Sequence, residues 1–264
     1  MTSATDQPRR RAAFPPNWRA RIGFVLLALY VVYACAHMGV SLERLQVGME
    51  HGQRFLARMF PPNFGRWELI VSGIVESLQI AVIATFFGIV LALPTGFLAA
   101  RNLMPVWVTW PARALIALCR SFHPIIVAII FVKAIGFGAL AGVMALIVAS
   151  IGFISKLFAE AIEEISLKQV EAVRATGAGF LSVLIMGVLP QVLPRFIGFS
   201  TYQLDSNLRN STMVGIVGGG GIGATLFTAY QRFDFDVVLA ILIVIVAMIM
   251  VAEVISTWAR KVFQ

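Results

Sequence analysis

Apolar residues occur in six long runs that are separated by short polar segments. The runs cover roughly residues 22–40, 70–98, 107–135, 138–159, 186–207 and 235–258. A helix needs ~20 apolar residues to cross the hydrocarbon core of a bilayer, whereas a membrane β-strand needs only ~10. The pattern therefore predicts an all-α membrane protein with six transmembrane helices, of which the second and third are long enough to tilt.

Composition excludes a soluble protein. Of the 264 residues, 59% are hydrophobic and 13% are charged, with a mean hydropathy of +0.87. Soluble domains are about half apolar and about a quarter charged. The net charge of +8 does not indicate nucleic-acid binding, because no soluble domain carries it. The two cysteines lie inside predicted spans without metal-ligand spacing, so we expect no metal site.

Basic residues predict the orientation. They surround the connection between the fourth and fifth spans, precede the first span, and follow the second and sixth. The residues are Arg9, Arg10, Arg11, Arg19, Arg21, Arg101, Lys156, Lys168, Arg174, Arg260 and Lys261. With six spans these segments share one side, which the positive-inside rule makes cytoplasmic. Both termini are therefore expected in the cytoplasm.

The same pattern divides the chain into a tail and a membrane domain. Residues 1–20 are rich in Arg, Pro and small polar types and are expected to be a disordered cytoplasmic tail. Residues 21–264 form the transmembrane domain, and its first span is extended as far as residue 69. The connection 41–69 must lie outside although it carries charges of both signs. Its apolar positions predict an amphipathic piece on the outer membrane surface.

A short charged helix is predicted between the fourth and fifth spans. Glu164 precedes Lys168 by four residues, a favourable spacing for a helical ion pair, and Glu171 and Arg174 follow at spacings of three. A cation near the helix end, such as Arg174, suits the helix dipole. Such charges are unusual between two membrane spans.

This charged helix is followed by a turn and a second segment. Gly177 or Gly179 is expected to end the helix in a left-handed conformation. An apolar segment then runs over residues 180–186, ahead of Pro190. Residues 164–187 therefore predict a helix–turn–helix bracket on the cytoplasmic face. The alternative is an ordinary amphipathic connector.

The bracket resembles the signature of permease subunits of ATP-binding-cassette importers. That signature reads Glu-Ala-Ala, three residues, Gly, nine residues, Ile, one residue, Leu-Pro. The corresponding positions here are Glu171-Ala172-Val173, Gly177, Gly187, Leu189 and Pro190. Val173 and Gly187 depart from the usual alanine and isoleucine, which predicts looser packing at these positions.

The resemblance implies a type I ABC importer permease fold in a bacterial inner membrane. It implies that the bracket is a coupling helix that docks on a separate ATPase, through Lys168, Glu171, Ala172, Arg174 and Gly177. The implied partners are two ATPase copies, a second permease copy or a paralogue, and a periplasmic or lipid-anchored binding protein. This chain has no GxxxxGK[ST] loop, so we expect no cofactor and no catalytic residue here, and ATP with Mg²⁺ on the ATPase.

Further segments resemble the permeases of phosphonate importers, from about residue 70 to the end of the chain. They are Glu76–Ala81, Leu93–Asn102, Val170–Ala178, Asn207–Thr212 and Gly215–Gly223. The resemblance implies import of phosphonate, phosphite or phosphate by alternating access. Methionine importers share the glycine run and are the nearest alternative. An ion-driven secondary transporter would predict inverted repeats and an acidic relay in the spans, and the sequence shows neither. A channel would leave the bracket without a purpose.

Polar residues inside the spans are candidates for the substrate pathway, because ionisable groups at membrane depth usually face a cavity or a partner. Guanidinium groups with hydroxyls and amides suit phosphoryl oxygens. The alternative is that Arg120 and Arg209 snorkel to the membrane surface or pair with Glu76, Asp205 or backbone carbonyls. The candidates are Arg120, Ser121, His123, Asn207, Arg209, Ser211 and Thr212.

The glycine run ahead of the last span predicts a gate. Its spacing also matches a dinucleotide fingerprint, which needs a βαβ unit that this pattern does not contain. Close helix packing is one alternative. We favour a non-helical break, because consecutive glycines disfavour a helix. The expected gate residues are Gly218, Gly219, Gly220, Gly221 and Gly223.

Overall fold

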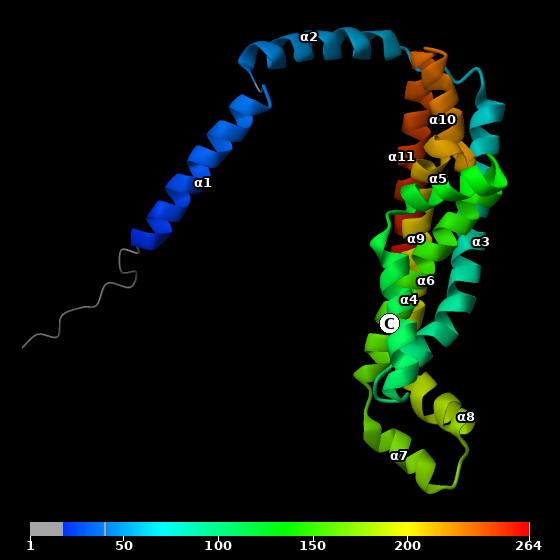
Figure 1. Ribbon diagram of the computed structural model, residues 1–264. Coiled ribbons are helices and arrows are strands. Elements are labelled where there is room, and N and C mark those ends of the chain that lie inside the picture. The colour runs from blue at the N-terminus through cyan, green and yellow to red at the C-terminus, as the bar shows by residue number, and fades with distance from the viewer. Residues whose placement is uncertain (1–17, 40, 264) are drawn as a thin grey trace, which may run out of the picture. The chain divides into compact units, whose positions relative to one another are not determined.

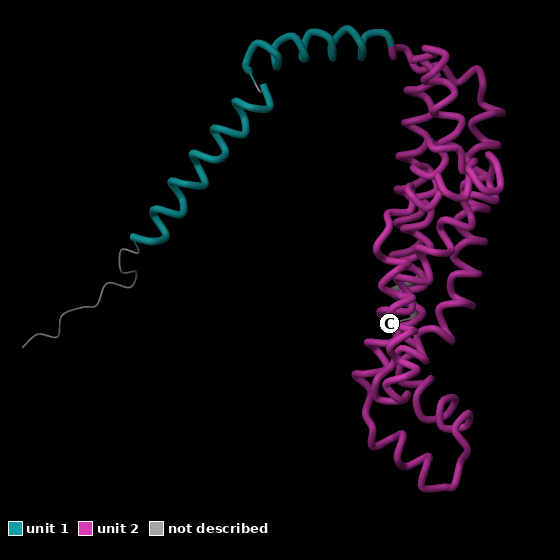
Figure 2. Tube along the Cα trace, viewed as in Figure 1, with its two compact units in different colours: residues 1–58 teal, residues 59–264 magenta. Residues whose placement is uncertain are grey.

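The computed structural model describes residues 18–39 and 41–263 of the chain (Figure 1). These residues divide into two compact units with a boundary between residues 58 and 59 (Figure 2). This boundary lies within residues 21–69, the predicted extension of the first span. Residues 1–17 of the predicted tail lie outside the described residues.

The first unit contains a span-length helix and an amphipathic helix. Helix α1 covers Trp18–His37 and has no buried residue. Its 20 residues extend for ~30 Å, which matches the hydrocarbon core. Because α1 begins at Trp18, the last residues of the predicted tail are helical. Helix α2, Leu42–Met59, is the amphipathic piece expected within residues 41–69, and its last residue belongs to the second unit.

The second unit is a bundle of helices. Its helices are α3 (Trp67–Ala99), α4 (Val106–Ser121), α5 (Pro124–Ile135), α6 (Ala139–Glu163), α7 (Leu167–Ala175), α8 (Phe180–Val183), α9 (Leu189–Val214), α10 (Gly221–Gln231) and α11 (Phe235–Phe263). Two π-helical turns, η1 (Leu184–Val188) and η2 (Gly215–Gly219), flank α9. No strand occurs in the described part of the chain, and the predicted all-α class is confirmed.

Five of the six predicted spans match continuous membrane-length segments. Within residues 18–39 and 41–263, five segments are long and apolar enough to cross a bilayer. The fifth predicted span, 186–207, belongs to a longer segment of 40 residues from Phe180 to Gly219. The sixth span begins at Phe235, as predicted.

The third predicted span, 107–135, is not a continuous helix. Helices α4 and α5 meet at a bend of 90°. Phe122 and His123 have extended backbone angles (ψ 137° and 141°), and Pro124 begins α5. A proline disfavours the helical conformation of the residue before it, so the helix ends ahead of Pro124. The predicted third span is therefore a bent pair of helices, and counting this pair as one span keeps the predicted total of six among the described residues.

Helix α3 packs closely along α6 through a face of small residues. A β-carbon on Gly88 would overlap the β-carbon of Ser150 on α6, and one on Gly96 would lie 2.6 Å from Cδ1 of Phe158. Such faces let two membrane helices approach closely, where van der Waals packing holds them together. Small residues are buried along one side of α3, where Gly73 and Ser77 contact α10 instead of α6. The others are Ala81, Ala84, Gly88, Ala92, Gly96 and Ala99.

This close approach predicts that Gly88→Ala lowers the free energy of unfolding by about 1–3 kcal/mol, because the added methyl group overpacks the contact with Ser150. Gly198→Ala on α9 is the matched control, since a β-carbon there meets nothing within 4 Å. Thermal unfolding in detergent should give a lower midpoint for the first variant and an equal or higher midpoint for the second. Equal midpoints for Gly88→Ala and the unmodified protein would contradict the packing.

Candidate functional site

Helices α7 and α8 form the predicted bracket at one end of the second unit (Figure 1). Helix α7 is followed by Gly177 with φ 78°, a left-handed conformation that favours glycine. Gly179 has extended angles instead, with φ −66° and ψ 165°. Of the two glycines expected to end the helix, Gly177 is therefore the one that makes the turn.

The bracket is anchored in the hydrophobic core. Val170 of α7, Val183 of α8 and Val188 of η1 are buried in one cluster with Phe158 and Phe196 from the two flanking long helices. The rings of Phe158 and Phe196 lie 4.7 Å apart. Helix α7 makes its contacts with α8 and with η1, which runs directly into α9, so the bracket is joined to the long helices through this shared core.

Polar contacts close the base of the bracket. The side chain of Gln191 accepts a hydrogen bond from the backbone N–H of Ser166 at 3.0 Å and donates one to the carbonyl of Gly187 at 2.6 Å. Gln191 therefore joins the start of α7 to the turn before α9. No motif in the sequence pointed to Gln191. Its position directly after Pro190 was the only available signal.

The expected ion pair between Glu164 and Lys168 does not form. Helix α6 ends at Glu163 and α7 begins only at Leu167, so the two charges are not on one helix. Glu164 instead pairs with Arg195 of α9 at 2.5 Å. Together with the contact between the rings of Phe158 and Phe196, this ion pair joins the end of α6 to α9.

The outer face of α7 carries the predicted coupling residues. Lys168, Glu171, Ala172 and Arg174 are all exposed, as is Gly177 in the following turn. No described residue forms an ion pair or a side-chain hydrogen bond with Lys168, Glu171 or Arg174. Three charged side chains on one short, anchored helix thus remain available to a partner.

The two departures from the permease signature lie against each other. A β-carbon on Gly187 would be 3.6 Å from Cγ2 of Val173 and 3.4 Å from Cα of Val170. The larger residue at 173 therefore fills part of the space left by the smaller residue at 187. The expectation of loose packing is wrong here, because the two changes compensate in volume.

The predicted pathway residues on α9 are mainly inside the protomer. Asn207 is fully buried and donates to the hydroxyls of Thr85 at 2.9 Å and Ser150 at 2.8 Å, while its carbonyl accepts from Gln203 at 2.9 Å. In this conformation Asn207 cannot contact a substrate. It joins α9 to α3 and α6 through a satisfied polar network.

The other candidates on α9 have similar surroundings. Arg209 pairs with Asp205 at 2.6 Å, which is the alternative stated for this arginine. Ser211 is buried and donates to the carbonyl of Leu208 at 2.7 Å. Thr212 is buried, and its hydroxyl has no partner among the described residues. The polar groups of Arg209 and Ser211 thus have partners within the protomer.

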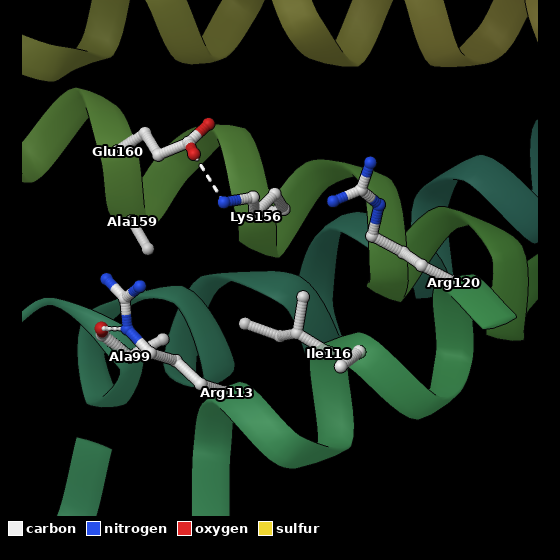
Figure 3. Close-up of a pocket in the computed structure, with 8 residues that line it drawn as sticks. Ala99, Arg113, Ile116, Arg120, Lys156, Ala159 and Glu160 are labelled. Carbon is white, nitrogen blue, oxygen red and sulfur yellow. Dashed lines mark hydrogen bonds and ion pairs between the residues drawn. The ribbon is translucent and has the colours of Figure 1, made fainter. Parts of the chain in front are cut away.

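The candidates near the third span lie at the bend between α4 and α5. Ser121 donates to the carbonyl of Ala117 at 2.7 Å, and Nδ1 of His123 accepts from the N–H of Ile125 at 3.4 Å. Arg120 lines a pocket of about 310 Å³ with residues of α6 (Figure 3). Arg120 was expected near the middle of the third span, and it stands in the last turn of α4, next to the bend between α4 and α5.

The glycine run contains the predicted break. Gly218 (φ 100°), Gly220 (φ 79°) and Gly221 (φ 74°) have positive φ angles, which favour glycine. Gly221 is also the first residue of α10, and Gly223 lies within this helix. The break is held by a hydrogen bond of 2.9 Å from the N–H of Gly138 to the carbonyl of Gly218. Gly219 lies between Gly218 and Gly220 and is buried.

A cavity of about 830 Å³ borders this break. Glu76 of α3 lines it together with Phe137, Gly218, Gly220 and Phe227. Irregular backbone at membrane depth is tolerated only where it is buried in protein or lines a cavity. The cavity thus supplies the surroundings that a non-helical break needs.

Comparisons with known proteins agree with this architecture. Residues 92–264 match the family described as binding-protein-dependent transport system inner membrane component. The phosphate-import permease protein PhnE of Mycolicibacterium smegmatis is 44% identical over 77% of this chain, which spans 39% of that relative. The phosphite transport system permease protein PtxC of Stutzerimonas stutzeri is 37% identical over 95% of this chain and 92% of its own length.

A solved structure shows the same fold. An inward-facing conformation of the MetNI methionine ABC transporter superimposes with a TM-score of 0.66 and 26% identity. The match covers 76% of this chain and 99% of that chain. The predicted type I importer permease fold is confirmed.

The contact between positions 173 and 187 predicts a coupled pair. Gly187→Ile alone should destabilise the protein, because the larger side chain meets Val173 and Val170. Val173→Ala combined with Gly187→Ile should recover much of the loss, with a coupling energy of about 0.5–3 kcal/mol. Thermal unfolding of the two single variants and the double variant measures this energy. Purely additive effects would contradict the compensation.

The contacts of Gln191 predict a loosened bracket in Gln191→Leu. The variant keeps the side-chain size but removes both hydrogen bonds, each worth about 0.5–1.5 kcal/mol. Amide hydrogen exchange over residues 166–188 should become about tenfold faster. Gln169→Leu, a change on the exposed face of α7, is the control and should leave exchange unchanged. The same exchange rate in both variants would show that Gln191 does not hold the bracket.

Proposed function

We propose a transport function for this chain, which belongs to the family of binding-protein-dependent transport system inner membrane components. By this membership it is an inner-membrane transport component and not an enzyme. It acts as the permease subunit of an ATP-driven importer. Its cargo is phosphonate or a related phosphorus oxyanion, phosphite or phosphate. The names of two relatives, a phosphate-import and a phosphite permease, support this substrate class.

The importer needs partners that this chain does not supply. An ABC ATPase provides the energy, and a substrate-binding protein delivers the cargo, as the family description and the ABC transporter among the similar structures imply. The complete machine contains two ATPase copies, which bind ATP and Mg²⁺, and a second permease copy or a paralogue. The binding protein is periplasmic or lipid-anchored.

The single observation that carries this function is the anchored bracket with its unpaired charges. Lys168, Glu171 and Arg174 face outward on α7, whose inner side shares a core with α6 and α9. The bracket lies in the cytoplasm and docks in a groove of the ATPase. When the ATPase closes, it displaces α7. Because α7 packs on η1, which continues directly into α9, and shares a buried core with α6, its displacement moves both long helices as a rigid lever.

The glycine break serves as the gate in an alternating-access cycle. Closure of the ATPase opens the region from Gly218 to Gly223 toward the outside, and hydrolysis returns the pathway to the inside. Glycines with left-handed angles suit this role, because the break can rearrange without a side chain to be moved. The cavity of about 830 Å³ beside it supplies space for the movement.

The coupling role predicts that Glu171→Arg abolishes uptake and weakens co-purification of the ATPase. A reversed charge in a partner groove is unfavourable, and loss of transport should be at least about tenfold, the effect of 1.4 kcal/mol. Uptake of phosphite by reconstituted complexes and the yield of bound ATPase are the measurements.

Gln169→Arg is the matched control for this experiment. Gln169 is exposed on the same helix but lies about 200° from Glu171 around the axis, at ~100° per residue. The control should retain uptake and ATPase binding. Normal uptake and ATPase binding in Glu171→Arg would remove Glu171 from the interface.

A further inference from the structure

One face of α4 and one face of α6 bring three cations to the same pocket. Arg113 and Arg120 are separated by seven residues, two turns of α4, and Lys156 approaches from α6 (Figure 3). The rest of the lining consists of Glu160 and the apolar residues Ala99, Ile116, Ala117 and Ala159. The volume of about 310 Å³ suits a small ligand.

Two of the three cations are already compensated within the protomer. Arg113 pairs with Glu163 at 2.5 Å and donates to the carbonyl of Ala99 at 2.9 Å. Lys156 forms an ion pair with Glu160 one turn along α6. These pairs hold the guanidinium and the ammonium in place at two sides of the pocket.

Arg120 is the uncompensated cation. No described residue accepts a hydrogen bond or forms an ion pair with its guanidinium. Its stem lies against Gly152, where a β-carbon would come within 2.8 Å of Cγ of Arg120. The missing side chain at Gly152 therefore admits the arginine to the surface of α6. Three cations against two carboxylates, Glu160 and Glu163, leave an excess charge of +1 at this pocket.

We propose that this pocket binds a phosphoryl oxyanion between Arg120 and Lys156. Arg120 is exposed within the protomer and its charge is unpaired among the described residues, and an anion at this position compensates that charge. A guanidinium donates two parallel hydrogen bonds to phosphoryl oxygens, and an ammonium adds a point charge. The apolar floor at Ile116 and Ala159 reduces competition from water. The choice of a phosphoryl group over other anions rests on the proposed function.

The location of the pocket suggests two sources of the phosphoryl group. Glu163, which holds Arg113, is the last residue of α6 ahead of the bracket, so the pocket lies toward the end of the unit that carries α7 and α8. An imported anion meets this end last. The phosphate of an anionic lipid headgroup in the same leaflet has the same chemistry, and the experiment separates the two.

The test uses the complete complex of permease and ATPase, purified and placed in nanodiscs. Equilibrium dialysis measures binding of inorganic phosphate in discs of phosphatidylcholine. Native mass spectrometry measures retained phosphatidylglycerol in discs that contain this lipid. The variants are Arg120→Gln and Lys156→Gln. Arg101→Gln is the control, because Arg101 is exposed and does not line the pocket.

Loss of a charge-assisted contact should lower the affinity for the bound species about tenfold or more in both variants and leave the affinity unchanged in the control. A loss of phosphate binding identifies a free anion as the ligand, and a loss of retained phosphatidylglycerol identifies a lipid. The proposed site is overturned if neither species binds the unmodified complex. It is also overturned if both species bind Arg120→Gln as well as they bind the unmodified complex. Uptake of phosphite is measured in parallel. Failure of uptake in the unmodified complex counts against the proposed function and leaves the site to be judged by binding alone.

Discussion

The close contact between α3 and α6 is the constraint on which the rest of the second unit depends. Lipid offers no hydrophobic force that drives two membrane helices together, so they must gain from van der Waals packing at short distance. Gly88 and Gly96 on α3 admit Ser150 and Phe158 of α6 to this distance. With this pair in place, Asn207 of α9 reaches both helices through hydroxyl groups at 2.8–2.9 Å. The polar groups are satisfied only because the helices approach so closely.

The short surface helix α7 is joined to the membrane part by packing on one side and by polar contacts at its base. The bracket has a buried side, at Val170 and Val183, and a charged side that faces away from the protomer. Gln191 and the ion pair between Glu164 and Arg195 join its base to α9. In the proposed coupling mechanism, a displacement of α7 passes to α9 through packed side chains and hydrogen bonds rather than through a flexible loop. The glycine break stands at the other end of α9, where the backbone is interrupted by three left-handed glycines.

Much of the fold follows from local pattern, and the failures have identifiable causes. The length of the apolar runs predicted the long helices, because the bilayer thickness sets the minimum length of a span. The bend within the third span was not predicted, because Pro124 disfavours a helical conformation for His123 and hydrophobicity alone does not show this. In the bracket, spacing predicted the helix and the turn at Gly177. The contact of Gln191 depends on residues 25 positions apart in the sequence, which no local pattern contains.

By itself, the sequence determined the class of the protein, the number and extent of most spans, the charged bracket and the place of the glycine break. These properties depend on periodicity, length and charge within one segment. Only the tertiary structure decided which polar residues in the spans are internal and which remain unpaired. From the sequence alone, Asn207 and Arg120 are equally good candidates for a substrate pathway. In the structure, the amide of Asn207 donates hydrogen bonds to Thr85 and Ser150. Arg120 instead lines a pocket between helices. Whether a polar group has a partner depends on which helices pack side by side, and that is decided by long-range packing.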